Sequence, residues 1–313
     1  MNLQTQIPFS KKSNNLIDYK SNILLLGSCF SENIGEKLEY HKIQNTQNPF
    51  GILFHPAAIE RLIANAIEHK QYTEKDVFFH NEQWHCFEAH SQLSHTSKEA
   101  LINGLNANLN STFNKLQNAT HIIMTLGTAW AYRYLKTGEF VANCHKVPQS
   151  EFEKVLLSVE DITETLKNII AQIRSINYNV EVVFTVSPIR HIKDGFIENT
   201  QSKAHLISSI HQIIGNKSSY FPSYEIMMDE LRDYRFYSED MIHPNQTAIN
   251  YIWERFKMVW ISEDSYSIMD EVDTIQKGLR HKPFNPDSDA HKAFVEKLQA
   301  RILKLKAQFP HFK

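Results

Sequence analysis

Cysteine is scarce in this chain of 313 residues, which contains only Cys29, Cys86 and Cys144. The number is odd and the three residues are far apart, so no disulfide framework is indicated. A reducing compartment, and hence a cytoplasmic location, is therefore expected. Neither a C-x-x-C nor an H-E-x-x-H spacing is present, so the common sequence signatures of a zinc site are missing as well.

Long apolar runs and an excess of one charge are also lacking. The first sustained apolar stretch, Ile23–Leu26, is far too short to span a bilayer. Residues 1–15 hold no apolar core of signal-peptide length, which predicts that no leader is present. The 33 Lys and Arg nearly balance the 35 Asp and Glu. This balance argues against nucleic acid or anionic lipid as a partner.

What the sequence does contain is an alternation of short apolar runs and longer amphipathic segments. This pattern is typical of parallel strands covered by helices, in an open doubly wound α/β sheet. Strands are predicted at Ile23–Gly27, Lys42–Thr46, His121–Leu126, Glu181–Val186 and Tyr224–Met228. Helices are predicted at Glu32–His41, Pro56–His69, Lys98–Leu116, Asp161–Ile173 and Thr200–Ile214.

Two segments interrupt the alternation and are predicted as β-hairpins. The first covers residues 77–91, and the second covers residues 131–145 with Lys136, Thr137 and Gly138 as its turn. Ligands in a doubly wound sheet bind beyond the carboxyl ends of the strands. Hairpins inserted after the second and third strands are therefore expected to form walls or lids of a pocket.

The alternation ends near residue 260, which predicts an α/β domain over residues 1–260 and a helical extension over residues 261–313. An amphipathic helix is expected at Asp287–Phe309. Its apolar side carries Phe294, Leu298, Ile302 and Leu305. We expect this side to pack back on the domain. Docking of a partner subunit, in a homo-oligomer, is the alternative.

The strongest local signal for chemistry is GSCFS, where the first strand runs into a helix. Gly27 permits a sharp turn, which places Ser28 at the helix N-terminus. Unpaired N–H groups there favour developing negative charge, as an acyl-transfer enzyme requires around its nucleophile. On this segment alone, a Ser28 that only caps the helix is the stronger interpretation. Cys29 is an alternative nucleophile, although a small buried thiol is favoured for it.

A second signal is the pair Asp240 and His243, three residues apart and just before a predicted helix. The loop lies near the end of the alternation and can return to the carboxyl edge beside Ser28. There His243 would deprotonate Ser28, and Asp240 would orient the imidazole. The alternative is a capping Asp beside a surface His.

These segments and several others resemble the GSCFA family, a branch of the SGNH/GDSL-type hydrolases. GSCFS departs from the name-giving motif only at Ser31. Further similar stretches are NPFGILFHP from Asn48, TLGTAWAY from Thr125, SPIRHIKDG from Ser187, YFPSYEI from Tyr220 and DMIHP from Asp240. The resemblance covers roughly residues 20–260. It implies a three-layer α/β/α sandwich with a five-stranded parallel sheet of flavodoxin-like topology.

The resemblance implies that Ser28 is the nucleophile and that Asp240 and His243 complete the catalytic set. Gly51 in NPFG would donate to the oxyanion together with the Ser28 N–H. The usual Gly-x-Asn block is altered, because Gly127 and Thr128 are followed by alanine instead of asparagine.

The third oxyanion donor is therefore open between Thr128 and Asn143 of the neighbouring hairpin. Candidates for substrate contact are His55, His90, Trp130, His145 and Arg190. For Arg190 the alternative is an ion pair with Asp194 or Glu198. For Trp130, with Tyr132 and Tyr134, the alternative is packing inside the hairpin.

A cluster of histidines raises a metal site as a further hypothesis. The candidate ligands are His80, His85, Cys86, His90, His95, Cys144 and His145. Their spacing matches no common zinc motif, and successive strand residues point to opposite faces, so no metal is predicted.

The sequence thus favours an SGNH-type serine hydrolase that needs no cofactor and cleaves an acyl ester. Its substrate would be a small-molecule or carbohydrate ester, such as an O-acetyl sugar. The alternatives are a non-catalytic glycan- or peptide-binding domain and an O-acyltransferase.

Overall fold

The computed structural model describes residues 5–215 and 217–312. Its centre is a sheet of five strands that are all parallel, in the order β10-β9-β5-β1-β2. The strands are β1 (Ile23–Gly27), β2 (Asn45–Gln47), β5 (His121–Leu126), β9 (Glu181–Val186) and β10 (Ser218–Tyr220). The central strands β1, β5 and β9 are buried along their whole length, as expected of strands covered on both faces.

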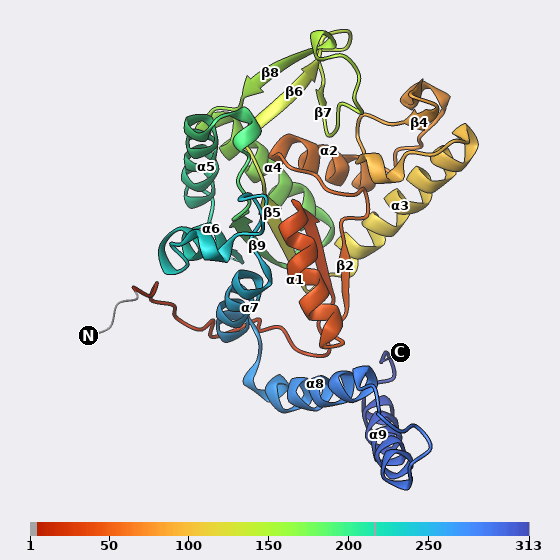
Figure 1. The fold of residues 1–313 in the computed structure, drawn as a ribbon. Helices are drawn as coiled ribbons and strands as arrows, with labels where there is room; N and C mark the ends of the chain where they lie inside the picture. The colour runs from red at the N-terminus through yellow and green to blue at the C-terminus, as the bar shows by residue number, and fades with distance from the viewer. Residues whose placement is uncertain (1–4, 216, 313) are drawn as a thin grey trace.

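Successive residues of the central strands face two separate cores. Leu24 and Ile122 face one core, while Ile23 and Ile123 face the other. The first core is covered by α2 (Pro56–Ile67), α3 (Lys98–Asn118), α4 (Val159–Ile176) and α5 (Phe196–His211). The second is covered by α1 (Cys29–Tyr40), α7 (Gln246–Trp260) and α8 (Tyr266–Arg280). The α/β fold with a five-stranded parallel sheet is confirmed, with its layers visible in Figure 1.

The fifth predicted strand was wrong. Residues 224–228 belong to the short helix α6 (Ser223–Glu225) and the π-helical turn Ile226–Glu230. The buried side chains in this segment are those of Ser223, Ile226, Met227 and Glu230, which is a helical spacing. The fifth strand is instead β10, which comes just before Phe221 and has only three residues. The second strand begins at Asn45 instead of Lys42.

Both predicted hairpins are present. β3 (Phe78–His80) pairs antiparallel with β4 (Gln83–His85). β6 (Trp130–Tyr134) pairs antiparallel with β7 (Phe140–Val141), and on its other edge with β8 (Phe152–Leu156), a strand that was not predicted. Figure 1 shows this small sheet above the end of β5, beyond the carboxyl edge of the main sheet.

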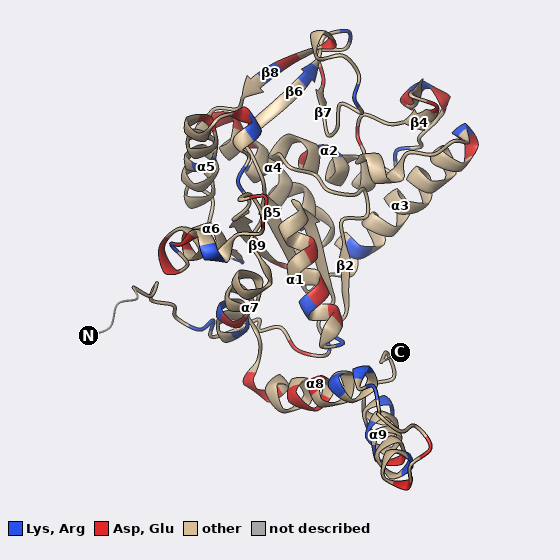
Figure 2. Cartoon of the chain, viewed as in Figure 1, with Lys and Arg blue, Asp and Glu red and all other residues tan. Residues whose placement is uncertain are grey.

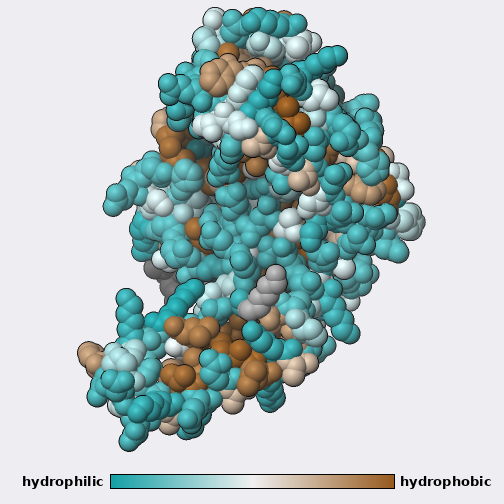
Figure 3. All heavy atoms as spheres, turned by 90° about the vertical axis from the view of Figure 1, so that its right-hand side faces the viewer, coloured by the Kyte–Doolittle hydropathy of each residue, from teal (hydrophilic) through white to brown (hydrophobic). Residues whose placement is uncertain are grey.

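The C-terminal segment forms α8 and α9 (Asp289–Gln308), at the opposite end of the sheet from the hairpins (Figure 1). Leu298 and Leu305 of α9 belong to the second core. Figure 3 shows apolar surface on the lower part of the molecule, where this helical pair lies. Exposed apolar side chains of this region are Leu279 of α8, Phe284 between the two helices, and Phe294, Val295 and Leu303 of α9. Short 3-10 turns occupy Glu74–Asp76, Ser91–Leu93, Gln149–Glu151, Ile192–Asp194, Tyr234–Phe236 and Glu263–Ser265.

Acidic and basic residues are interspersed over the elements seen in Figure 2, with no large region of one sign. Within the described ranges, every helix is too short or too polar to cross a membrane.

Candidate active site

The turn between β1 and α1 is fixed on three sides. Gly27 has a φ of +125°, and a Cβ added there would lie 2.1 Å from the carbonyl oxygen of Thr125. The Ser28 N–H donates to that same oxygen at 2.9 Å. The Asn48 side-chain oxygen accepts from the Gly27 N–H at 2.9 Å, and the Gly27 carbonyl accepts from Leu53. Only glycine fits this conformation, as the GSCFS segment predicted.

Ser28 is the N-cap of α1. Its Oγ accepts a hydrogen bond from the Phe30 N–H at 3.3 Å, and its exposed fraction is 0%. Ser28 therefore caps the helix, as one of the two interpretations predicted. The same geometry places Oγ at the positive end of a twelve-residue helix, where negative charge is stabilised. Capping and nucleophilic attack are compatible at this position.

The Cys29 thiol also lies at the start of α1, but its environment disfavours the thiolate. Burial raises its pKa, and the charge of Glu32 raises it further. The amides of Cys29 and Phe30 and the ammonium of Lys203 act in the opposite direction without reversing the shift. A protonated thiol is a poor nucleophile, so these surroundings weigh against Cys29 in that role.

Asp240 and His243 form a hydrogen-bonded pair. Their Oδ2 and Nδ1 atoms are 2.6 Å apart, and Asp240 Oδ1 accepts from the backbone N–H groups of Ile242 and His243. These bonds lower the pKa of Asp240 to about 2, so its carboxylate is ionised at neutral pH. A carboxylate only accepts, so Nδ1 is the donor in this bond, and in the neutral imidazole Nε2 then has a free lone pair. Both side chains are nearly half exposed.

Arg190 holds the loop that carries this pair. Its Nη1 donates to the Met241 carbonyl at 3.1 Å, and its backbone N–H donates to the Ile242 carbonyl at 3.2 Å. Its guanidinium also lies over the rings of Phe196, Tyr234 and Tyr237. Asp194, one of its alternative partners, is paired with Lys154 instead.

No hydrogen bond joins Ser28 to His243 among the residues that the structure describes. His191 follows Arg190 in the loop after β9. Its Nε2 would be 3.3 Å from a Cβ on Gly127, and that atom is buried without a hydrogen-bond partner among the described residues. Burial, followed by the charges of Lys203 and His243, lowers the pKa of His191 to about 3. His191 is thus a neutral ring near the end of β5.

Lys203 is the residue of this region that sequence reasoning missed. It lies on α5, 1% exposed, and its ammonium donates to the carbonyl oxygens of Gly127 at 2.7 Å and Ser187 at 2.8 Å. Burial lowers its pKa to about 7. A signal was present, because Lys203 shares the apolar stripe of its helix with Leu206 and Ile210.

The candidate oxyanion donors are largely hydrogen-bonded within the protein already. The Ser28 N–H, the first of them, donates to the Thr125 carbonyl at 2.9 Å. The Gly51 N–H donates to the Asn48 carbonyl at 2.7 Å. The Thr128 N–H donates to the Phe54 carbonyl, and its hydroxyl accepts from the Trp130 N–H. The side-chain oxygen of Asn143 accepts from the N–H of His145. The first amides of α1 are those of Cys29 and Phe30, and the Phe30 N–H already donates to Ser28 Oγ.

The candidate substrate-binding histidines make contacts within the protein. His55 caps α2 and its Nε2 donates to the Val141 carbonyl, joining that helix to β7. His90 packs over Gly51. His145 bonds to the Cys86 carbonyl, while its Nδ1 is buried without a hydrogen-bond partner among the described residues.

Trp130 donates through Nε1 to the Glu198 carbonyl, which ties β6 to α5. Across residues 5–215 and 217–312, no three His, Cys, Asp or Glu side chains converge as metal ligands would.

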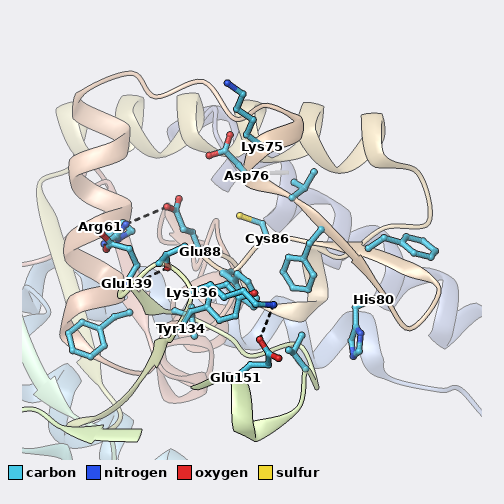
Figure 4. A pocket seen from close by; sticks show the side chains of 18 of the residues that line it. Arg61, Lys75, Asp76, His80, Cys86, Glu88, Tyr134, Lys136, Glu139 and Glu151 are labelled. Carbon is cyan, nitrogen blue, oxygen red and sulfur yellow. Dashed lines mark hydrogen bonds and ion pairs between the residues drawn. The ribbon is translucent and has the colours of Figure 1, made fainter. Parts of the chain in front are cut away.

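The two hairpins and α2 enclose an open cavity of about 530 Å³ (Figure 4). Arg61 contacts Glu139 and Glu88 on one side of the cavity. A separate ion pair joins Lys136 to Glu151 at 3.0 Å. Aromatic lining is supplied by Phe78, Phe87, Tyr134 and Phe140. Glu88 faces this cavity, whose lining residues include neither Ser28 nor Asp240 nor His243.

Comparison with models of protein families matches residues 22–256 to the GSCFA family. The chain belongs to the GSCFA family. Residues 272–313 of this GSCFA protein match the GSCFA domain protein, C-terminal domain. No curated protein matches its sequence. Among solved structures, it is similar to a carbohydrate esterase family 3 protein from Talaromyces cellulolyticus, with 9% identity and a TM-score of 0.38, over 81% of this chain and 99% of that chain.

Proposed function

We propose that this GSCFA protein is an SGNH-type serine hydrolase that cleaves an acyl ester through Ser28. The observation that carries the proposal is the Asp240–His243 pair, which orients an imidazole with its Nε2 lone pair available. Ser28 supports it from the end of β1, where the helix N-terminus stabilises negative charge. The loops that follow β1, β5 and β9 come together at this edge of the sheet.

The mechanism divides ester cleavage into two steps. His243 Nε2 takes the Ser28 hydroxyl proton as Oγ bonds to the ester carbonyl carbon, and Asp240 stabilises the imidazolium. The carbonyl oxygen becomes an oxyanion held by the first amides of α1. The C–O bond to the alcohol then breaks, and His243 returns the proton to the leaving alkoxide. Water attacks the acyl-enzyme by the same steps and releases the acid and free Ser28.

A carbohydrate is the proposed alcohol portion of the ester. Aromatic rings pack against the apolar faces of sugars, and ion-paired carboxylates and guanidinium groups hydrogen-bond to hydroxyls. The cavity between the hairpins offers both kinds of group, with Tyr134 among the rings and the Arg61–Glu139 pair among the polar groups. Its acidic and basic side chains nearly balance, which suits a neutral ligand.

Hydrolysis of short-chain p-nitrophenyl esters tests the reaction class. Wild-type protein should release p-nitrophenol, Ser28→Ala should lose the activity, and the matched neighbour Cys29→Ala should keep it. An activity that survives in Ser28→Ala, or that disappears only in Cys29→Ala, contradicts the proposal. Turnover that requires an added alcohol acceptor would identify an O-acyltransferase, which shares the first step.

A non-catalytic binding domain is the second candidate. The full burial of Ser28, and its lack of a hydrogen bond to His243 among the described residues, favour this alternative. It predicts saccharide binding by wild-type protein and by Ser28→Ala with equal affinity, and no ester hydrolysis by either. Calorimetric titration with oligosaccharides beside the ester assay separates the two functions.

A further inference from the structure

Lys203 is a buried lysine that pairs with no carboxylate among the residues that the structure describes. Its two hydrogen-bond acceptors are carbonyl oxygens, at Gly127 and Ser187, each the first residue after a central strand. Burying an ammonium is unfavourable unless its protons are hydrogen-bonded, and carbonyls compensate a full charge only in part. A hydrophobic side chain could be buried here with a smaller desolvation penalty than a lysine. Packing alone therefore does not explain a lysine at this position.

The position of the ammonium supplies a reason. It lies at the carboxyl edge, hydrogen-bonded to the residues that follow β5 and β9, and β5 is the direct neighbour of β1, which leads into Ser28 and α1. Without it, the carbonyls of Gly127 and Ser187 would present unpaired negative dipoles at the edge where an oxyanion has to form.

The other ionisable groups that face Lys203 are few. The Cys29 thiol faces it from α1, and the His191 ring faces it from the loop after β9. The ring of Tyr224 on α6 lies 5.7 Å from its Nζ. None of these three carries a negative charge at neutral pH. The Glu32 carboxylate of α1 does, and it acts on the Cys29 thiol more strongly than the Lys203 ammonium, which opposes it.

We propose that Lys203 is a positioning residue for the reaction at Ser28, tying the β5 and β9 loops together and placing a positive charge beneath the start of α1. The inference rests on the proposed function of Ser28. Because burial lowers the pKa of Lys203 to about 7, the ammonium is present at lower pH and is lost as the pH rises through that value. The reactivity of Ser28 should decline with it.

The rate of Ser28 labelling by a fluorophosphonate probe, from about pH 6 to about pH 9, tests this inference without a known substrate. In labelling, the Ser28 Oγ–P bond forms, fluoride leaves and His243 accepts the proton. Wild-type protein should be labelled more slowly above about pH 7. At about pH 6 the labelling rate of Lys203→Met should be lower than that of wild type by roughly tenfold or more. Its labelling rate should not decline above about pH 7.

The control is Lys217→Met. The Lys217 ammonium also donates to a backbone carbonyl, that of Tyr178, but it is exposed and precedes β10 at the opposite edge of the sheet. This variant should keep the wild-type rate and pH profile. Equal labelling of wild type and folded Lys203→Met overturns the inference.

If Lys203→Met does not fold, the pH profile of wild-type labelling still tests the inference. A rate of Ser28 labelling that does not fall between about pH 7 and about pH 9 contradicts it. Absence of label on wild-type Ser28 contradicts the proposed function itself, which is a different result.

Discussion

The buried ammonium of Lys203 makes a quantitative prediction about stability. Its pKa is about 7 in the folded protein, against 10.5 for a lysine in water. Below pH 7 the group is charged in both the folded and the unfolded state. Above pH 7 the folded protein releases the proton while the unfolded chain retains it. The unfolded state then binds more protons, so the free energy of unfolding rises with pH through this window.

The slope of this rise is about 1.4 kcal/mol for each pH unit. Between about pH 7 and about pH 9, Lys203 should therefore add ~2–3 kcal/mol to the free energy of unfolding. Lys203→Met lacks the titrating group, so the difference between wild type and variant should change by this amount. Lost hydrogen bonds and altered packing contribute to the difference equally at each pH.

Urea unfolding followed by circular dichroism, at pH values from about 6 to 9, measures this difference. Lys217→Met, which removes an exposed ammonium bonded to Asn179, is the matched control and should follow the wild-type curve. A difference between wild type and Lys203→Met that is independent of pH, or that moves in the opposite direction, refutes the account of Lys203.

Three further predictions concern the turn, the Asp–His pair and the cavity. Gly27→Ala should lower the free energy of unfolding by roughly 2–4 kcal/mol, measured by urea unfolding, because its Cβ collides with the Thr125 carbonyl. Wild-type stability in this variant would contradict the turn geometry. Asp240→Asn should reduce p-nitrophenyl ester hydrolysis roughly 10³-fold, because the amide no longer fixes the imidazole proton on Nδ1. Unchanged hydrolysis would exclude Asp240 from the mechanism. Tyr134→Ala should raise the KM for acetylated oligosaccharides about tenfold and leave p-nitrophenyl acetate hydrolysis unchanged. An unchanged KM in Tyr134→Ala would show that the sugar does not bind in the cavity between the hairpins.

Sequence patterns predicted the central strands well because burial on both faces leaves continuous apolar runs. β1, β5 and β9 have the predicted bounds for this reason. β10 has no such run, because it is a three-residue edge strand, Ser218–Tyr220, held by pairing with β9. The richer apolar segment that follows it was mistaken for the strand, although its burial has helical spacing.

The candidate site was predictable in part. The pairing of Asp240 with His243 follows from local sequence, because backbone N–H groups two and three residues away hold the carboxylate. The turn was predictable from Gly27 itself, although the groups that fix it, the Thr125 carbonyl and the Asn48 side chain, lie far away in the sequence. Lys203 was not predictable in this way, because its acceptors lie 76 and 16 residues away and depend on the sheet order. The helix α8 was missed although Met269, Val272 and Ile275 repeat every three residues.

The central claim is that Ser28 is an activated nucleophile. Its most direct test is to treat the purified wild-type protein with a fluorophosphonate probe and to locate the adduct by peptide mass spectrometry, with Ser28→Ala and His243→Ala beside it. We expect one adduct, on Ser28, that is absent from Ser28→Ala and strongly reduced in His243→Ala. An adduct on Cys29, or none under conditions where a known serine hydrolase is labelled, would contradict that claim.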